Sequence, residues 1–233
     1  MIGIVVPVYW EAENIENLLN EIDGKIRTEK KVFIVYDVEE DPTIEVVNSL
    51  IKKYNFDIKL IKNKYGRGVS KAIKTGFEVA DTDAVLVVMA DLSDDLSIVD
   101  RMYEMIKNGY DIVCGSRYTK EGRHFGGHLI KKMMSRFAGL SLHYLTGIPT
   151  RDVTNSFKMY NKNSLDKITI ESNEGFEIGM EICVKIFVKG GKIGEIPSIW
   201  VDRVKGKSKF KILKWLPKYL KWYFYAFRKL IEK

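Results

Sequence analysis

Apolar, β-branched runs alternate with amphipathic, charged stretches along the first half of the chain. The runs predict β-strands at residues 2–9, 31–37, 56–63, 84–91 and 110–117. Between them, apolar residues recur at three- and four-residue spacing and predict helices at residues 11–26, 42–54, 68–80 and 97–109. Strand–helix alternation is typical of right-handed βαβ units. The pattern therefore predicts an α/β fold whose mostly parallel sheet is flanked by helices on both faces.

The pattern changes after Arg117. It predicts a long amphipathic helix over 127–147, a strand or loop over 154–162, a second helix over 175–191 and a late strand over 192–203. No linker-like or repetitive segment separates the two halves. We therefore expect one domain over residues 1–209, followed by a separate terminal segment, 210–233.

Charge is distributed unevenly between these two parts. The net charge is +7, but residues 203–233 carry eleven Lys or Arg and one acid, a charge of +10 that leaves −3 for the remainder. The chain is thus a mildly acidic domain with a strongly basic end. Its two cysteines, Cys114 and Cys183, lie in separate apolar stretches, as buried free thiols of a reducing compartment do.

The terminal segment combines a basic stripe with many aromatic residues. Lysines recur at three- and four-residue spacing from Lys211 to Lys221, and Pro217 is expected to break or kink the helix. The part after Pro217 spans roughly 22 Å, too short to cross a hydrocarbon core of ~30 Å. A basic, aromatic, amphipathic helix fits the plane of the lipid headgroups. We expect a cytoplasmic protein, peripherally bound to the inner face of the cell membrane through 210–233; a helix docked on the domain is the alternative, and no nucleic acid is expected.

Polar residues follow several predicted strands, which is where ligands bind in open α/β sheets. Asp37 ends the second strand and Asp91 follows the fourth. Such carboxylates are suited to hold Mg²⁺ or Mn²⁺ on a nucleotide diphosphate, although Asp91 and Asp94 could equally cap the next helix. Arg117, after the fifth strand, suits a phosphate or a surface ion pair.

Two further motifs give weaker signals. In YGRGVSK (65–71), Gly66 and Gly68 precede a helix, so this turn could contact a phosphate, but its spacing is not that of a P-loop. His124 and His128 are four residues apart, with no third metal ligand near them in the sequence. We interpret the first as a turn and expect no zinc site at the second.

Taken together, these motifs resemble the family-2 glycosyltransferases of the GT-A fold, and most nearly the branch of dolichyl-phosphate mannose synthases and polyprenyl-phosphate glycosyltransferases. VVPVYWEAENI resembles the family's P-x-Y-N-E-x-E-N-I, with Trp10 in place of Asn. VYDVEEDPT stands where the family has DDGSPDGT, and GSRY matches a family motif. The stretch from Lys189 to Lys209 matches G-x-x-I-x-E-x-P-x-x-x-x-x-R-x-x-G-x-S-K.

The resemblance implies a role for each matching residue. The nucleotide-sugar would be bound by Pro7, Tyr9, Glu11, Asp37, Asp91 and Ser93. Phosphate would be bound by Arg117, Arg203, Ser208 and Lys209. Asp152 lies where the family places an Asp near the reacting centre, which makes it a catalytic candidate together with Arg117 and Asp91.

The chain departs from the family at its metal motif. The family has D-A-D where this chain has Met89-Ala90-Asp91, and Ser93 stands where Gln or Gly is frequent. Asp91 is then the expected metal ligand, for Mg²⁺ or Mn²⁺.

The resemblance implies an inverting transfer of a hexose from a GDP- or UDP-sugar to a polyprenyl or dolichyl phosphate. Because a lipid phosphate is already anionic, it needs no strong base, whereas a hydroxyl acceptor does. Two alternatives remain open: a glycosyltransferase acting on a hydroxyl of a lipid-linked or envelope glycan, and a non-catalytic relative that binds nucleotide or membrane.

Overall fold

A seven-stranded sheet with strand order β3-β2-β1-β4-β7-β5-β8 organises the computed structural model, which describes residues 1–202 and 212–231. Its strands are β1 (Ile2–Val8), β2 (Lys30–Tyr36), β3 (Asp57–Lys62), β4 (Ala84–Val87), β5 (Ile112–Ser116), β7 (Lys158–Asn161) and β8 (Ile193–Pro197). Only β7 runs antiparallel to its neighbours, β4 and β5. The predicted α/β fold with a mostly parallel sheet is confirmed.

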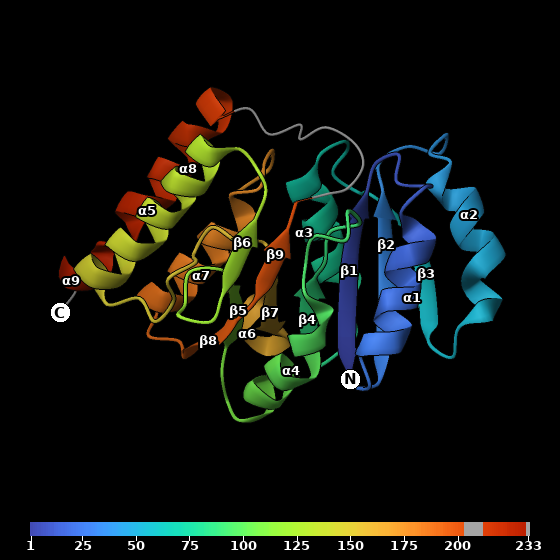
Figure 1. Cartoon of the computed structure of the whole chain (residues 1–233), viewed down its shortest axis with the longest axis horizontal. Coiled ribbons are helices and arrows are strands. Elements are labelled where there is room, and N and C mark those ends of the chain that lie inside the picture. The colour runs from blue at the N-terminus through green and yellow to red at the C-terminus, as the bar shows by residue number, and fades with distance from the viewer. Residues whose placement is uncertain (203–211, 232–233) are drawn as a thin grey trace.

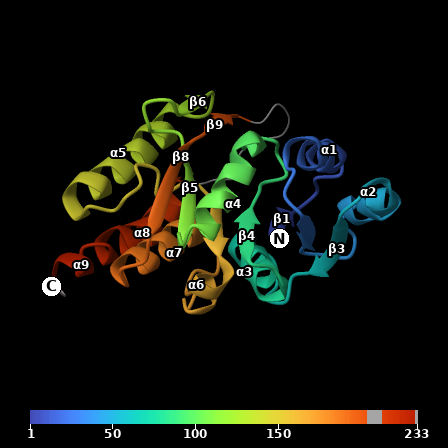
Figure 2. The ribbon, with the colours of Figure 1, turned by 90° about the horizontal axis from the view of Figure 1, so that it is seen from below.

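Helices cover both faces of this sheet (Figures 1 and 2). On one face lie α1 (Ile15–Lys25) and α4 (Val99–Lys107), with α2 (Thr43–Leu50) and the short 3₁₀ turn η1 (Ile51–Lys53) packed beside α1. On the other face lie α3 (Val69–Val79) and α7 (Ile178–Val188). A 3₁₀ turn, η2 (Leu96–Ile98), precedes α4, and α6 (Lys162–Asp166) follows β7. The first-half elements match the pattern of apolar residues within a few positions.

Successive residues of a buried strand contribute to the two faces in turn. On β1, Ile4 and Val6 pack toward α1 and α4, whereas Val5 packs toward α3. The helix α3 lies close to β1, since a Cβ added to Gly76 of α3 would be 2.3 Å from Val5 Cγ1. The two apolar cores hold the sheet between two layers of helices.

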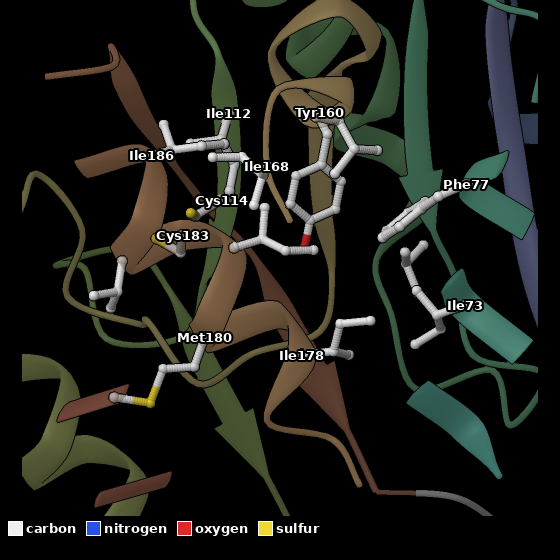
Figure 3. Close-up of a cluster of buried hydrophobic side chains, with 14 of the residues drawn as sticks. Ile73, Phe77, Ile112, Cys114, Tyr160, Ile168, Ile178, Met180, Cys183 and Ile186 are labelled. Atoms are coloured by element: carbon white, nitrogen blue, oxygen red, sulfur yellow. The ribbon is translucent and has the colours of Figure 1, made fainter. Parts of the chain in front are cut away.

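The core beneath α3 and α7 contains both cysteines (Figure 3). Phe77 and Tyr160 meet edge to face there, with ring centroids 5.4 Å apart. Cys114 of β5 and Cys183 of α7 are both buried and both free thiols. The expected burial of two free thiols is confirmed.

The second half of the chain adds a small sheet and a helical pair. β6 (Arg123–Phe125) pairs in parallel with β9 (Ile199–Val201), and α5 (Leu129–Thr146) lies beside α8 (Ile212–Tyr225) at one end of the molecule (Figure 1). α9 (Arg228–Ile231) follows. The late strand predicted over 192–203 is in fact two strands, since pairing moves from β5 to β6 at Ser198. Of the break or kink expected at Pro217, the break does not occur, because α8 continues through this residue.

The helix α8 is docked on the domain through its aromatic face. Trp222 is 2% exposed and lies under the ammonium group of Lys185, 4.7 Å from its ring. Lys221 forms an ion pair of 2.6 Å with Glu171, and the Tyr223 hydroxyl donates to Ser141 of α5. In the described part of the chain, no helix combines the length and the apolar character needed to cross a membrane.

Candidate active site

The carboxyl ends of β1, β2, β4 and β5 open into one cleft with a volume of about 720 Å³. Most of the residues predicted to bind ligand line it together: Pro7, Tyr9, Glu11, Asp37, Asp91, Ser93 and Arg117. Parallel strands bring their ends to a single edge of the sheet, which explains how residues so far apart in sequence meet. Arg203, Ser208 and Lys209 lie outside the described residues.

The loop after β1 is fixed by hydrogen bonds to two buried side chains, Asp41 and Thr43. The amide of Trp10 donates to Asp41 Oδ2 at 2.9 Å, and the amide of Glu11 donates to Thr43 Oγ1 at 2.9 Å. Trp10 has a φ of +62° and is 53% exposed. A left-handed backbone suits the Asn of the family motif better than a Trp. The loop therefore presents Tyr9 and Glu11 to the cleft at the cost of some backbone strain.

Asp37 organises the neighbouring turn. Its Oδ1 accepts from Asn63 Nδ2 at 2.8 Å, and its Oδ2 accepts from the amide of Gly68 at 2.9 Å. The turn also brings Arg67 and Gly68 to the cleft wall. The sequence singled out the two glycines of this turn, but not the arginine between them.

The segment from Met89 to Asp95 forms the loop after β4. Asp91 Oδ1 accepts from the amide of Ser93 at 3.2 Å and from its hydroxyl at 2.6 Å. Asp95, not Asp91 or Asp94, caps the following turn by accepting from the amide of Ser97. The predicted capping alternative therefore applies to a different carboxylate.

Asp94 belongs to the same loop but does not line the cleft. It accepts from the amide of Met89 at 3.3 Å. Desolvation, and then the nearby carboxylate of Asp91, raise the pKa of Asp94 to about 7. Asp91 is therefore the one carboxylate of this loop that lines the cleft, where the family motif has two.

Arg117 forms a bidentate ion pair with Asp152 beneath the cleft. Its Nε and Nη2 donate to Oδ2 and Oδ1 at 2.7 and 2.8 Å, and its amide donates to Oδ2 at 3.0 Å. Asp152 is 0% exposed and does not line the cleft. Burial alone would raise the pKa of Asp152, but the charge and hydrogen bonds of Arg117 hold it below its ordinary value. This position is suited to orienting Arg117 and ill-suited to accepting a proton from a substrate.

The helix α5 adds further positive charge to this side of the cleft. Lys131, Lys132 and Ser135 line the wall, and Arg117 Nη2 donates to Ser135 Oγ at 3.0 Å. Lys132 Nζ donates to the carbonyl of His124 at 2.7 Å. Burial, followed by the charges of Arg117 and Lys132, lowers the pKa of His124 to about 4, so its imidazole is neutral at neutral pH. Sequence reasoning missed these α5 residues because amphipathic spacing alone does not show which side faces a ligand.

Beyond the lysines the cleft continues as an apolar groove between α5 and α8. Its walls are formed by Met134, Ala138, Phe176, Met180, Trp215, Leu216, Tyr219, Leu220 and Tyr223. One cleft thus joins three zones: a polar zone at the strand ends, a cationic zone around Arg117 and an apolar groove. Among the described residues, no group of three acidic, His or Cys side chains is placed to hold a metal ion.

Comparison with known proteins gives this architecture a family. A model described as "Glycosyl transferase family 2" matches residues 3–169. Dolichol-phosphate mannosyltransferase of Pyrococcus furiosus is 31% identical over 213 residues, which cover 90% of this chain and 59% of that relative. Polyprenol monophosphomannose synthase of Mycolicibacterium smegmatis is 22% identical, over 91% of this chain and 85% of the relative. The chain thus spans less than two thirds of the Pyrococcus protein.

Solved structures share the fold at low sequence identity. Glucosyl-3-phosphoglycerate synthase from Mycobacterium tuberculosis, in complex with UDP, superposes with a TM-score of 0.68 at 12% identity over 98% of this chain and 79% of that one. The same enzyme with Mn²⁺, UDP-glucose and phosphoglyceric acid gives 0.70 over 97% and 79%, and it has also been solved with Mg²⁺ and UDP. These similarities confirm the predicted GT-A fold.

Proposed function

The chain belongs to glycosyl transferase family 2, and we propose that it transfers a hexose, with inversion, from a nucleotide-sugar to a polyprenyl phosphate at a membrane surface. The observation that carries this proposal is the continuity of the cleft. A polar zone, a cationic zone and an apolar groove follow one another within a single cavity. A nucleotide-sugar would suit the polar zone, the phosphate of the acceptor the cationic zone, and its prenyl chain the apolar groove.

The donor half of the proposal rests on the strand ends. Pro7, Tyr9 and Glu11 would hold the nucleoside, with Asp37 at its base or ribose side, as the family resemblance implies. All four line the cleft. Pro7 lies in β1, the loop after β1 is held by hydrogen bonds from the amides of Trp10 and Glu11, and the carboxylate of Asp37 is held by Asn63 and Gly68. Such preorganisation lowers the entropic cost of binding.

The acceptor half rests on Arg117 and α5. The carboxylate of Asp152 holds the Arg117 guanidinium in place, and Lys131, Lys132 and Ser135 line the adjacent wall. Fixed positive charge and a hydroxyl there suit a phosphate monoester. The prenyl chain would leave this zone through the groove between α5 and α8.

The reaction we propose needs little from the protein beyond placement and charge. An oxygen of the lipid phosphate attacks the anomeric carbon, and the bond from that carbon to the nucleotide diphosphate breaks. No proton has to be removed from an ionised phosphate, which agrees with the buried, ion-paired position of Asp152. We therefore assign Asp152 the positioning of Arg117.

A divalent cation fits the site as a partner of the nucleotide. Asp91 is the sole carboxylate that the segment 89–93 contributes, and magnesium at nucleotide sites is commonly held by one or two carboxylates together with substrate phosphates. Asp91 would hold the ion, and when bound it would neutralise charge on the departing diphosphate.

A membrane contact would follow from the outer surface of the two neighbouring helices. α5 exposes Leu129, Ile130, Met133, Phe137, Tyr144 and Leu145, and α8 exposes Leu220 and Phe224. Exposed apolar side chains over two adjacent helices indicate an interaction surface, and the cleft that would receive a prenyl chain opens between the same helices. This extends the contact predicted for residues 210–233 to include α5. The proposed phosphate-binding role of Arg203, Ser208 and Lys209 rests on the resemblance.

A transfer assay tests the proposal. The chain is incubated with radiolabelled GDP-mannose, GDP-glucose, UDP-glucose or UDP-N-acetylglucosamine, a polyprenyl phosphate, Mn²⁺ and detergent, and with the matching polyprenol as an acceptor control. We expect labelled lipid from the phosphate and none from the alcohol. Arg117→Lys should reduce the transfer of label to the lipid phosphate at least tenfold. Arg101→Lys, on α4 away from the cleft, should leave this transfer unchanged. Transfer to the alcohol alone, or to neither lipid, would contradict the proposal.

A further inference from the structure

The turn between β3 and α3 places one arginine on the donor side of the cleft. Gly66 and Gly68 have φ values of +79° and +134°, so both positions require glycine. The amide of Gly68 and the side chain of Asn63 are held by the two oxygens of Asp37. Arg67, between the two glycines, lines the cleft, and it is an exposed residue. The turn is therefore anchored at both ends, and it brings one cationic residue to the cleft wall.

The opposite wall of the same zone has one carboxylate fewer than the family motif. Met89 lines the cleft where the family motif has its first Asp. The thioether of Met89 is a soft ligand and does not bind magnesium, which prefers oxygen ligands. With Asp91 as the sole carboxylate of this segment, the site would hold a cation through fewer protein ligands than the family motif provides. The positive charge that a diphosphate requires must then come in larger part from side chains.

Strand spacing puts Arg67 within range of that diphosphate. Asp37 directly follows β2, Met89 follows β4, and the strand between β2 and β4 is β1. Neighbouring strands lie about 4.8 Å apart, so the two walls are roughly 10 Å apart at the sheet edge. A nucleotide whose base lies by Tyr9 would carry its diphosphate across this gap. An arginine side chain anchored beside Asp37 can reach it.

We propose that Arg67 binds the donor diphosphate. Its guanidinium supplies part of the positive charge that, in the family motif, a metal ion held by two carboxylates would supply. This inference rests on the proposed function. A guanidinium binds phosphate oxygens in a bidentate manner, with the geometry and charge of a strong hydrogen-bonded pair. The loss of such a pair is expected to weaken binding about tenfold or more.

Calorimetric titration of the whole chain tests this. GDP and UDP are titrated, each against its monophosphate, GMP or UMP, first in EDTA and then in Mn²⁺. We expect wild-type protein to bind one diphosphate in EDTA. Arg67→Ala should lower the affinity for the diphosphate about tenfold or more, and the affinity for the monophosphate less than threefold. Arg67→Lys should retain part of the affinity, because it keeps the charge but loses the bidentate geometry.

The controls separate this inference from its premise. Arg101→Ala, of the same residue type but on α4 outside the cleft, should bind as wild type does. Equal losses for diphosphate and monophosphate would indicate a merely structural role for Arg67 and overturn the inference. An unchanged diphosphate affinity in Arg67→Ala, or wild-type binding that appears only with Mn²⁺, would overturn it as well. If wild-type protein binds no nucleotide in either condition, the proposed function itself fails.

Discussion

Replacing Asp152 with Asn separates a positioning role from that of a catalytic base. The substitution keeps the size of the side chain but removes the charge that compensates Arg117. Both groups are almost fully buried: the side chains are 0% and 10% exposed, and they are joined by two short hydrogen bonds. An Asn side chain can accept from the guanidinium through only one atom, and its amino group would face the arginine as a second donor.

The structure sets the magnitude of this effect. Removing one partner of a buried ion pair costs about 3–5 kcal/mol, because the remaining charge stays buried without compensation. For a chain of this size each kcal/mol lowers Tm by about 2–4 °C, so Asp152→Asn should melt roughly 6–20 °C below wild type. The pKa of Asp152 is lower in the folded than in the unfolded protein. Its stabilising contribution is therefore present above the unfolded pKa and lost as pH falls through the folded value.

The assay pairs thermal unfolding with steady-state kinetics. We expect Asp152→Asn to lower Tm and to raise KM for the lipid phosphate, since Arg117 is no longer held in place. Asp166→Asn is the matched control, because Asp166 also forms an ion pair, with Lys162, but its side chain is 56% exposed. Its Tm should change by about 2 °C or less. An unchanged Tm and KM together with a kcat reduced by several orders of magnitude would refute the reasoning and identify Asp152 as a base.

Three further predictions follow from individual contacts. Trp222→Ala removes a buried ring and should cost about 3–5 kcal/mol and expose α8 to protease, whereas Phe224→Ala, whose side chain is 66% exposed, should leave Tm nearly unchanged. The pKa of His124 is lowered to about 4 in the folded protein, so its contribution to stability is present above pH 6.5 and is lost as pH falls to 4. Between these pH values the Tm of His124→Gln, measured by thermal unfolding, should therefore fall by about 2–4 °C less than that of wild type, a difference that is small because the imidazole is partly exposed. The double variant Phe137→Ser and Phe224→Ser should pellet less with anionic vesicles at an unchanged Tm, and wild-type pelleting would contradict the membrane contact.

The strands and their polar ends were predictable because burial on both faces leaves a strong signal. β1, β2, β4 and β5 are near-continuous apolar runs, and each is followed by a polar loop. Strand–helix alternation then places those loops at one edge. The shared cleft of Asp37, Asp91 and Arg117 follows from these local facts.

The features that the sequence did not predict depend on contacts between distant segments of the chain. The partners Arg117 and Asp152 are 35 residues apart, so no spacing rule joins them. β6 has three residues and β7 has four, and strands this short leave too few positions for a periodic pattern. The terminal helix shows a related ambiguity, since an amphipathic aromatic stripe fits a protein core and a lipid surface equally well. Trp222 lies in the core, and Phe224 is exposed.

A ternary complex tests the central claim most directly. The measurement is a crystal structure of the whole chain with the nucleotide diphosphate that binds it and a short-chain prenyl phosphate. We expect the diphosphate between Arg67 and Asp91, the lipid phosphate within hydrogen-bonding distance of Arg117 and Ser135, and the prenyl chain between α5 and α8. Nucleotide and lipid phosphate bound in separate cavities, or a prenyl chain outside the groove, would contradict the account.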